Sequence, residues 1–141
     1  MRYKVIKRLN KNQINDLYKL YKNEWWTKDR EKKDIKKMLK YTPIIIGVVK
    51  DKKLIAFARV LSDFTYKAEI YDIIVRKKYR NKGVGKLLIK EILNHKKLKN
   101  VKQFNLQCED KMVLFYKKFG FKSVDSLIYM RYLKTDIIQK R

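Results

Sequence analysis

The sequence predicts an α/β fold with one hydrophobic core. Short apolar runs typical of strands alternate along the chain with segments whose apolar residues recur every three or four positions, as on a helix. Hydrophobic residues make up 45% of the chain and charged residues 37%, which suits a core beneath a very polar surface. Because 141 residues fit one domain, we expect a single domain over residues 1–141, with a basic tail from about residue 134.

The N-terminal third predicts a strand followed by two helices. Residues 3–9 alternate as in a strand, and apolar residues between 14 and 21 recur at helical spacing. Thr27 is expected to cap the second helix, with acidic residues in its first turn, and Pro43 to end it.

The middle of the chain predicts three strands and a helix. Residues 44–49 and 54–61 flank a polar turn and are typical of the two strands of a hairpin. The run 68–75 is rich in β-branched residues and predicts a third strand. An amphipathic helix is expected to begin near residue 84.

The last third predicts further strands around one helix. A strand over 101–108 is expected to lead into a helix over 112–119, and residues 121–124 and 127–133 have the apolar character of two closing strands.

The formal net charge of +24 favours anionic partners, but the lysines are scattered over every segment. Charge alone therefore gives little support to nucleic-acid binding as the main role. No apolar run is long enough for a membrane span, and the N-terminus lacks a signal sequence, so we expect a cytoplasmic protein with no membrane partner. Cys108 and His95 are the only residues of their types, so no disulfide or metal site is expected, and His95 is predicted to lie on the surface.

A glycine loop is the most informative local feature. The predicted strand ending at Val75 is followed by Arg80-Asn81-Lys82-Gly83-Val84-Gly85 and then directly by a helix. Glycine lets the backbone approach a ligand closely, and the free amides of a helix start attract phosphate. Because the loop matches neither the nucleoside-triphosphate nor the dinucleotide spelling, we expect it to bind another diphosphate.

The sequence motif Arg-x-x-Gly-x-Gly, which follows Val75 and Tyr79, resembles the acetyl-CoA loop of the GCN5-related N-acetyltransferase (GNAT) superfamily. The segment from Phe115 to Phe121, with Tyr116 and a Gly-Phe pair, is similar to the family's last helix and the turn after it. The resemblance covers about residues 41–121. One departure is visible, since Glu109 or Asp110 stands where relatives often have an asparagine before the tyrosine.

The resemblance implies a mixed, centrally splayed sheet of six or seven strands flanked by four helices. It also implies transfer of an acetyl group from acetyl-CoA to a primary amine by direct attack in a ternary complex. Tyr116 would donate a proton to the departing thiolate or hold it by a hydrogen bond. The cofactor would be held by Ile73, Ile74, Val75, Arg80, Asn81, Lys82, Gly83, Val84, Gly85 and Lys86.

Two carboxylates on the strand before the loop, Glu69 and Asp72, are candidates for the general base that the resemblance implies. Alternation along a strand puts Glu69 and Tyr71 on one face and Asp72 on the other, unless a bulge intervenes. Either acid could instead be a solvated or salt-bridged carboxylate in a lysine-rich protein.

The resemblance implies that the turn between the first two helices lines the acceptor pocket, so one of the two adjacent tryptophans is expected to pack and the other to line it. An aromatic wall with a nearby acid would suit an amine with an apolar or aromatic body. The expected acceptor-site residues are Trp25, Trp26, Phe64, Tyr66 and Tyr71.

Two other functions stay open. The domain could bind acyl-CoA as a sensor without catalysis, or it could associate with nucleic acid through its basic surface. The acceptor could be a small molecule or a protein amine, and a homodimer is open because the last strands of relatives often mediate dimers. Cys108 as a nucleophile lacks a histidine nearby in the sequence to activate it.

Overall fold

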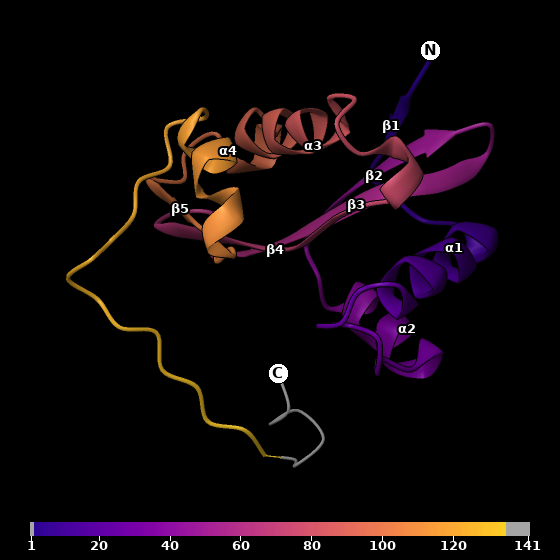
Figure 1. The fold of residues 1–141 in the computed structure, drawn as a ribbon, viewed down its shortest axis with the longest axis horizontal. Helices are drawn as coiled ribbons and strands as arrows, with labels where there is room; N and C mark the ends of the chain where they lie inside the picture. Colours follow the sequence, from indigo (N-terminus) through magenta and orange to yellow (C-terminus); the bar gives the residue numbers. More distant parts are fainter. Residues whose placement is uncertain (1, 135–141) are drawn as a thin grey trace. The chain divides into compact units, whose positions relative to one another are not determined.

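The computed structural model describes residues 2–134. The chain divides into two units, with the boundary between Gln107 and Cys108. The first unit holds the whole sheet and three of the helices, and the second holds a short helix and the chain that follows it. The predicted α/β fold class is confirmed (Figure 1).

The sheet has five strands in the order in which they occur along the chain. The first four are antiparallel neighbours, and the last two run parallel, so the sheet is mixed as predicted. The strands are β1 (Lys4–Ile6), β2 (Ile44–Lys50), β3 (Lys53–Ser62), β4 (Lys67–Val75) and β5 (Gln103–Asn105).

The expected count of six or seven strands is wrong for the described residues. Neither 121–124 nor the described residues of 127–133 pair with another strand, and apolar side chains there stay exposed, among them Leu127, Ile128 and Tyr132. An apolar pattern specifies a strand only where a neighbour supplies hydrogen bonds and a covering face.

Four α-helices accompany the sheet, as expected: α1 (Lys11–Lys22), α2 (Lys32–Lys40), α3 (Val84–Leu93) and α4 (Val113–Lys117). Helix α1 starts at a capping box, in which Asn10 and Gln13 each bind the other's backbone amide.

Two sequence predictions about single residues are wrong. Thr27 does not cap α2, which starts after Glu31; instead its buried hydroxyl donates to the carbonyl oxygen of Tyr21 at 2.8 Å and fastens the chain leaving α1. His95 is buried rather than exposed, and its Nδ1 accepts the amide of Lys97 at 3.1 Å at the turn after α3.

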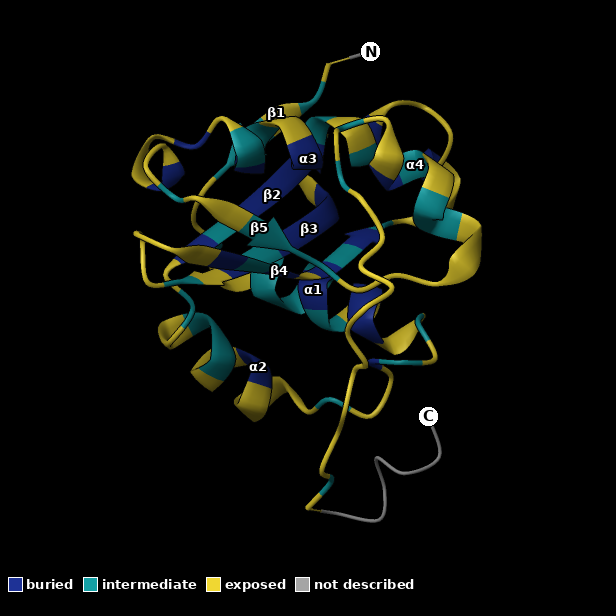
Figure 2. Cartoon of the chain, turned by 90° about the vertical axis from the view of Figure 1, so that its left-hand side faces the viewer, coloured by how far each residue is buried: buried dark blue, intermediate teal, exposed yellow. Residues whose placement is uncertain are grey.

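Helices cover both faces of the sheet in the first unit. Helices α1 and α2 lie on one face, and α3 lies on the other against β2, β3 and β4 (Figures 1 and 2). The buried cluster on the α1–α2 face includes Tyr21, Ile35, Phe57 and Ile74, and Trp26 packs against it. The prediction that one tryptophan packs is therefore confirmed.

Strand β4 parts from β5 after three residue pairs. The parallel ladder joins Lys67–Glu69 to Gln103–Asn105 and ends there, while β4 continues to Val75. The splay expected for the sheet is thus present, and it leaves one backbone edge of residues 70–75 without a strand neighbour in the described part of the chain.

A β-bulge lies in the same stretch of β4. The β3–β4 register slips by one residue between Phe57, paired with Ile74, and Arg59, paired with Tyr71. The extra residue falls at Asp72, whose φ of 56° is in the left-handed region that aspartate tolerates better than most residues.

Candidate functional site

The glycine loop presents an uncapped helix start. Gly83 is the N-cap of α3 with φ 83° and ψ 5°, and no side chain caps the helix there. The first helical hydrogen bond runs from Leu87 to the carbonyl of Gly83 at 3.1 Å, which leaves the amides of Val84, Gly85 and Lys86 available. A β-carbon on Gly83 would meet no atom within 4 Å, so the side of the loop at this residue is open. The structure thus fits an anion here.

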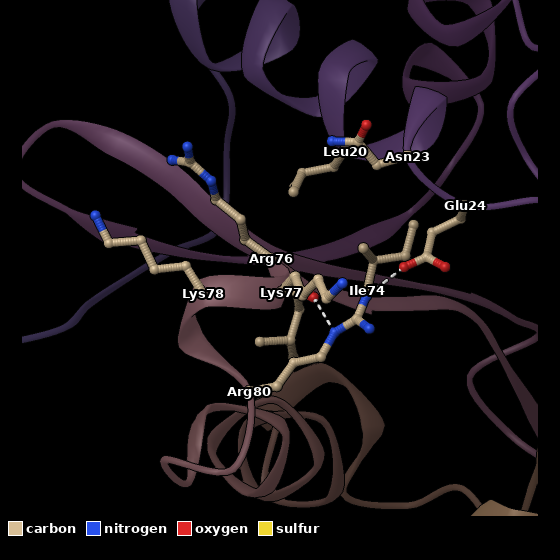
Figure 3. Close-up of a pocket in the computed structure, with 9 residues that line it drawn as sticks. Leu20, Asn23, Glu24, Ile74, Arg76, Lys77, Lys78 and Arg80 are labelled. Atoms are coloured by element: carbon tan, nitrogen blue, oxygen red, sulfur yellow. Dashed lines mark hydrogen bonds and ion pairs between the residues drawn. The ribbon is translucent and has the colours of Figure 1, made fainter.

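Arg80 ties the start of this loop to two other elements. Its Nε donates to the carbonyl of Val75 at 2.9 Å, and its Nη2 pairs with Glu24 beyond the end of α1 (Figure 3). These residues border a cavity of about 720 Å³ between the end of α1 and the end of β4. Its lining is Leu20, Asn23, Glu24, Ile74, Val75, Arg76, Lys77, Lys78 and Arg80.

Ile73, Ile74 and Val75, the three β4 residues expected to hold the cofactor, lie on the splayed stretch. Ile74 is buried in the α1–α2 core, so its side chain is a packing residue. Ile73 and Val75 are half-buried. The backbone of the three borders the edge that β5 leaves open, so a core role for the side chains and a backbone role at the edge are compatible.

Asp72 is the centre of a buried ionic cluster. Its Oδ2 accepts from Arg30 Nη1 at 2.6 Å, from Arg59 Nε at 2.6 Å and from the Tyr21 hydroxyl at 3.0 Å. Its Oδ1 accepts from Arg30 Nη2 at 3.3 Å. The Asp72 side chain is only 4% exposed. Because of the bulge, this carboxylate meets side chains on the α1–α2 face rather than pointing away from them.

The charged groups of this cluster stabilise one another in their ionised forms. Burial alone would raise the pKa of Asp72, but the hydrogen bonds and charges of Arg30 and then of Arg59 outweigh burial and hold that pKa below its usual value. Burial opposes the charge of Arg30 as well, and Asp72 raises the Arg30 pKa in spite of it. Burial and then the Asp72 charge raise the pKa of Tyr21, so its hydroxyl stays a donor.

Glu69 occupies a more open position at the fork of the splay. Its Oε1 accepts from Asn105 Nδ2 at 2.8 Å, and Asn105 Oδ1 accepts in turn from Gln103 Nε2 at 3.0 Å. No arginine or lysine of the described residues pairs with it within salt-bridge distance. One oxygen of this half-buried carboxylate therefore accepts a hydrogen bond from Asn105, and no described residue donates a hydrogen bond to the other oxygen.

Comparison with known families decides the identity. The family model described as the acetyltransferase (GNAT) family matches residues 11–121. The chain belongs to this family. The matched range includes the glycine loop, the splayed β4 and Tyr116, so the family resemblance seen in the sequence is confirmed.

Individual GNAT relatives agree. The N-acetyltransferase ycf52 of Pyropia yezoensis is 33% identical over 117 residues, covering 79% of this chain and 67% of that protein. A chloroplastic GCN5-related N-acetyltransferase of Arabidopsis thaliana is 32% identical over 52% of this chain, which is 28% of that longer protein. A GNAT acetyltransferase structure from Xanthomonas campestris superposes with a TM-score of 0.80 at 25% identity, covering 94% of each chain.

The GNAT tyrosine expected near the cofactor sulfur lies in the second unit. Tyr116 of α4 is buried, and its ring contacts Phe115 and Phe121 edge to face. Burial and then the nearby Cys108 raise the pKa of Tyr116 to about 12, so its hydroxyl carries a proton at neutral pH. Burial and then Asp110 raise the pKa of the Cys108 thiol, which disfavours the thiolate that a nucleophile needs.

The residues expected at the acceptor site of this GNAT domain are largely exposed. Trp25, Tyr66 and Tyr71 are 56%, 62% and 38% exposed, and Phe64 is 37% exposed at φ 62° in the β3–β4 turn. That turn is held by Asp63, whose carboxylate accepts the amides of the next residues and has a lowered pKa because of those backbone hydrogen bonds. Tyr71 lies beneath the guanidinium of Arg59 at 5.1 Å.

Sequence reasoning missed Arg30, Arg59 and Tyr21. Arg59 carried a usable signal, because it interrupts the apolar run of the strand 54–61 that is otherwise almost wholly buried. A charged residue in such a run requires a buried partner of opposite charge. No helix among the described residues is long and apolar enough to cross a membrane, and no group of acidic, histidine or cysteine residues there could hold a metal ion.

Proposed function

We propose that this GNAT domain is an N-acetyltransferase that uses acetyl-CoA and transfers the acetyl group to a primary amine by direct attack in a ternary complex. One observation supports this most strongly: the uncapped amides of α3 come at the end of the short connection that follows β4, a strand whose edge is open. The two features together fit a ligand with a diphosphate at one end and an amide-bearing arm at the other.

Acetyl-CoA would supply an acetyl group activated as a thioester. The amides after Gly83, with Lys82 and Lys86, would bind the diphosphate, and Asn81 with φ 62° would help turn the chain towards it. The backbone of Ile73 to Val75 would pair with the arm and polarise the carbonyl oxygen of the thioester.

Glu69 is the general base that we propose. The amine must lose a proton as its nitrogen bonds to the acetyl carbon, and Glu69 has a carboxylate oxygen that no described residue occupies. Asp72 fits this role poorly, because four hydrogen bonds from cationic and hydroxyl donors stabilise its charged form and lower its pKa. We assign Asp72 to holding the bulge.

Tyr116 is the acid that we propose for the sulfur. When the carbon–sulfur bond breaks, the thiolate needs a proton, and a hydroxyl with a pKa of about 12 is protonated and able to donate. The family match, whose range includes Tyr116, supports this role.

The test is a thiol-release assay with acetyl-CoA and a panel of primary amines, both small molecules and peptides. We expect turnover with at least one amine class and its loss in Gly83→Asp, which puts a negative charge before the α3 amides. Tight binding of acetyl-CoA with no turnover for any amine would overturn the proposal in favour of an acyl-CoA sensor.

A further inference from the structure

The ionic cluster at the β4 bulge carries a net positive charge. Asp72 contributes one negative charge and is shared by Arg30 and Arg59, so one positive charge is left over in a largely buried place. Of the two carboxylates that the sequence offered as the base, Asp72 is therefore neutralised. A cationic or neutral acceptor body gains nothing from Asp72.

The excess positive charge lies on the guanidinium group of Arg59, which reaches solvent. Its Nε is bound to Asp72, but no described residue accepts a hydrogen bond from its two terminal amino groups. No buried polar side-chain atom of the described residues lacks a partner, so these two groups must reach solvent, although the side chain is only 14% exposed. Two parallel N–H donors fixed in this way are suited to a carboxylate or a phosphate.

The position of Arg59 places this fork beside the proposed chemistry. Arg59 on β3 pairs in register with Tyr71 on β4, and cross-strand partners share a face of the sheet. Glu69, two residues before Tyr71 with no bulge between them, lies on that same face. Three groups thus lie on one face of the sheet at the start of the splay: the proposed base Glu69, the exposed ring of Tyr71 and the terminal amino groups of Arg59.

We propose that the acceptor is an amine that also carries an anionic group, a carboxylate or a phosphate, and that Arg59 binds this group. The proposal rests on the proposed function and specifies its substrate class. Arg59 is held for this role from two sides, by Asp72 at its Nε and by the Tyr71 ring under its guanidinium at 5.1 Å.

The experiment compares benzylamines that differ only in the group para to the aminomethyl substituent, and so in its charge. The set is 4-methylbenzylamine, 4-(aminomethyl)benzoate, 4-(aminomethyl)phenyl phosphate and 1,4-bis(aminomethyl)benzene, each assayed for kcat/KM with acetyl-CoA. We expect the carboxylate or the phosphate to be preferred over the neutral amine by about tenfold or more, and the dication to be the poorest. The better substrate of the two anionic amines shows whether the acceptor's anionic group is a carboxylate or a phosphate.

The variant Arg59→Gln is expected to lose this preference, measured as the ratio of kcat/KM for the anionic amine to kcat/KM for 4-methylbenzylamine. The control Lys90→Gln removes one positive charge from α3, on the other face of the sheet, and should keep the preference. Should Arg59→Gln fail to fold, Arg59→Lys keeps the pairing with Asp72 but loses the fork and should lower the preference.

A second readout does not depend on turnover. Calorimetric binding of 4-methylbenzoate, which has no amine, should be weakened about tenfold by Arg59→Gln and unchanged by Lys90→Gln. Equal use of the neutral and anionic amines, or equal loss of both in Arg59→Gln, would overturn the inference and leave the proposed function standing. No turnover with any amine would overturn both.

Discussion

The Nε of Arg80 donates to the carbonyl oxygen of Val75 at 2.9 Å, so the first residue of the glycine loop is fastened to the last residue of β4. This hydrogen bond links the proposed diphosphate site to the strand edge proposed to bind the pantetheine arm of the cofactor. Arg80 also pairs with Glu24, which extends this link to the chain after α1.

Arg80→Gln should weaken CoA binding by about tenfold, because both the anchoring bond and one positive charge are lost. The dissociation constant measured by calorimetry checks this. Lys90→Gln, which also removes one charge, is the control and should bind CoA as the parent does. An unchanged constant for Arg80→Gln would show that neither the link to Val75 nor the Arg80 charge contributes to binding.

Gly83→Ala should reduce CoA affinity far more than stability. With φ at 83°, a β-carbon costs roughly 1 to 2 kcal/mol of folding free energy, and it meets no protein atom within 4 Å. The added methyl would instead occupy the space over the α3 amides. Gly120→Ala at φ 97°, also with no atom within 4 Å, is matched in strain and should keep CoA binding. Parallel urea melts and CoA titrations separate the two effects, and equal CoA affinity in both variants would contradict the proposed loop.

Asp72→Asn should destabilise the protein by about 3 kcal/mol at pH 7, because two arginines lose their shared counter-ion in a buried place. Because the folded pKa of Asp72 is lowered, the stabilisation is complete above the ordinary aspartate value of about 3.9 and is lost as pH falls through the folded pKa. The difference in unfolding free energy should therefore shrink below about pH 4.

Denaturant melts at several pH values measure this difference. Asp51→Asn, which changes an 87% exposed carboxylate, is the control and should cause no measurable loss. A gap between Asp72→Asn and the parent that stays constant from pH 7 to pH 3 would argue against a charged Asp72 in the cluster.

Tyr116→Phe should lower kcat by about a hundredfold with little change in the KM for acetyl-CoA, because only proton donation to the thiolate is removed. Tyr132→Phe alters a tyrosine that is 88% exposed and should behave as the parent does. Steady-state thiol release measures both variants. If kcat is unchanged in Tyr116→Phe, the phenol is a packing residue of the second unit.

Local sequence patterns predicted most of the fold. The hairpin of β2 and β3, the strand before the loop and helix α3 were predicted because each depends on neighbouring residues and on the positions of glycine and polar turns. The prediction of two closing strands was wrong because the pattern of 127–133 shows only that the side chains are apolar. It does not show which neighbouring strand would pair with them or which face would cover them.

The ionic cluster was beyond sequence reasoning. Tyr21, Arg30, Arg59 and Asp72 come from four separate segments, and they meet only because the bulge re-aims Asp72. Alternation alone left two orientations open for Asp72, and only the slip in register between Phe57 and Arg59 decides between them.

The bulge also limits how this domain could be re-engineered. Position 72 must satisfy a left-handed backbone and provide a negative charge, and among the standard residues aspartate alone meets both demands well. Position 59 has no such backbone demand. A programme to alter acceptor preference should therefore keep 72 fixed and vary 59, together with 30 where charge balance requires it.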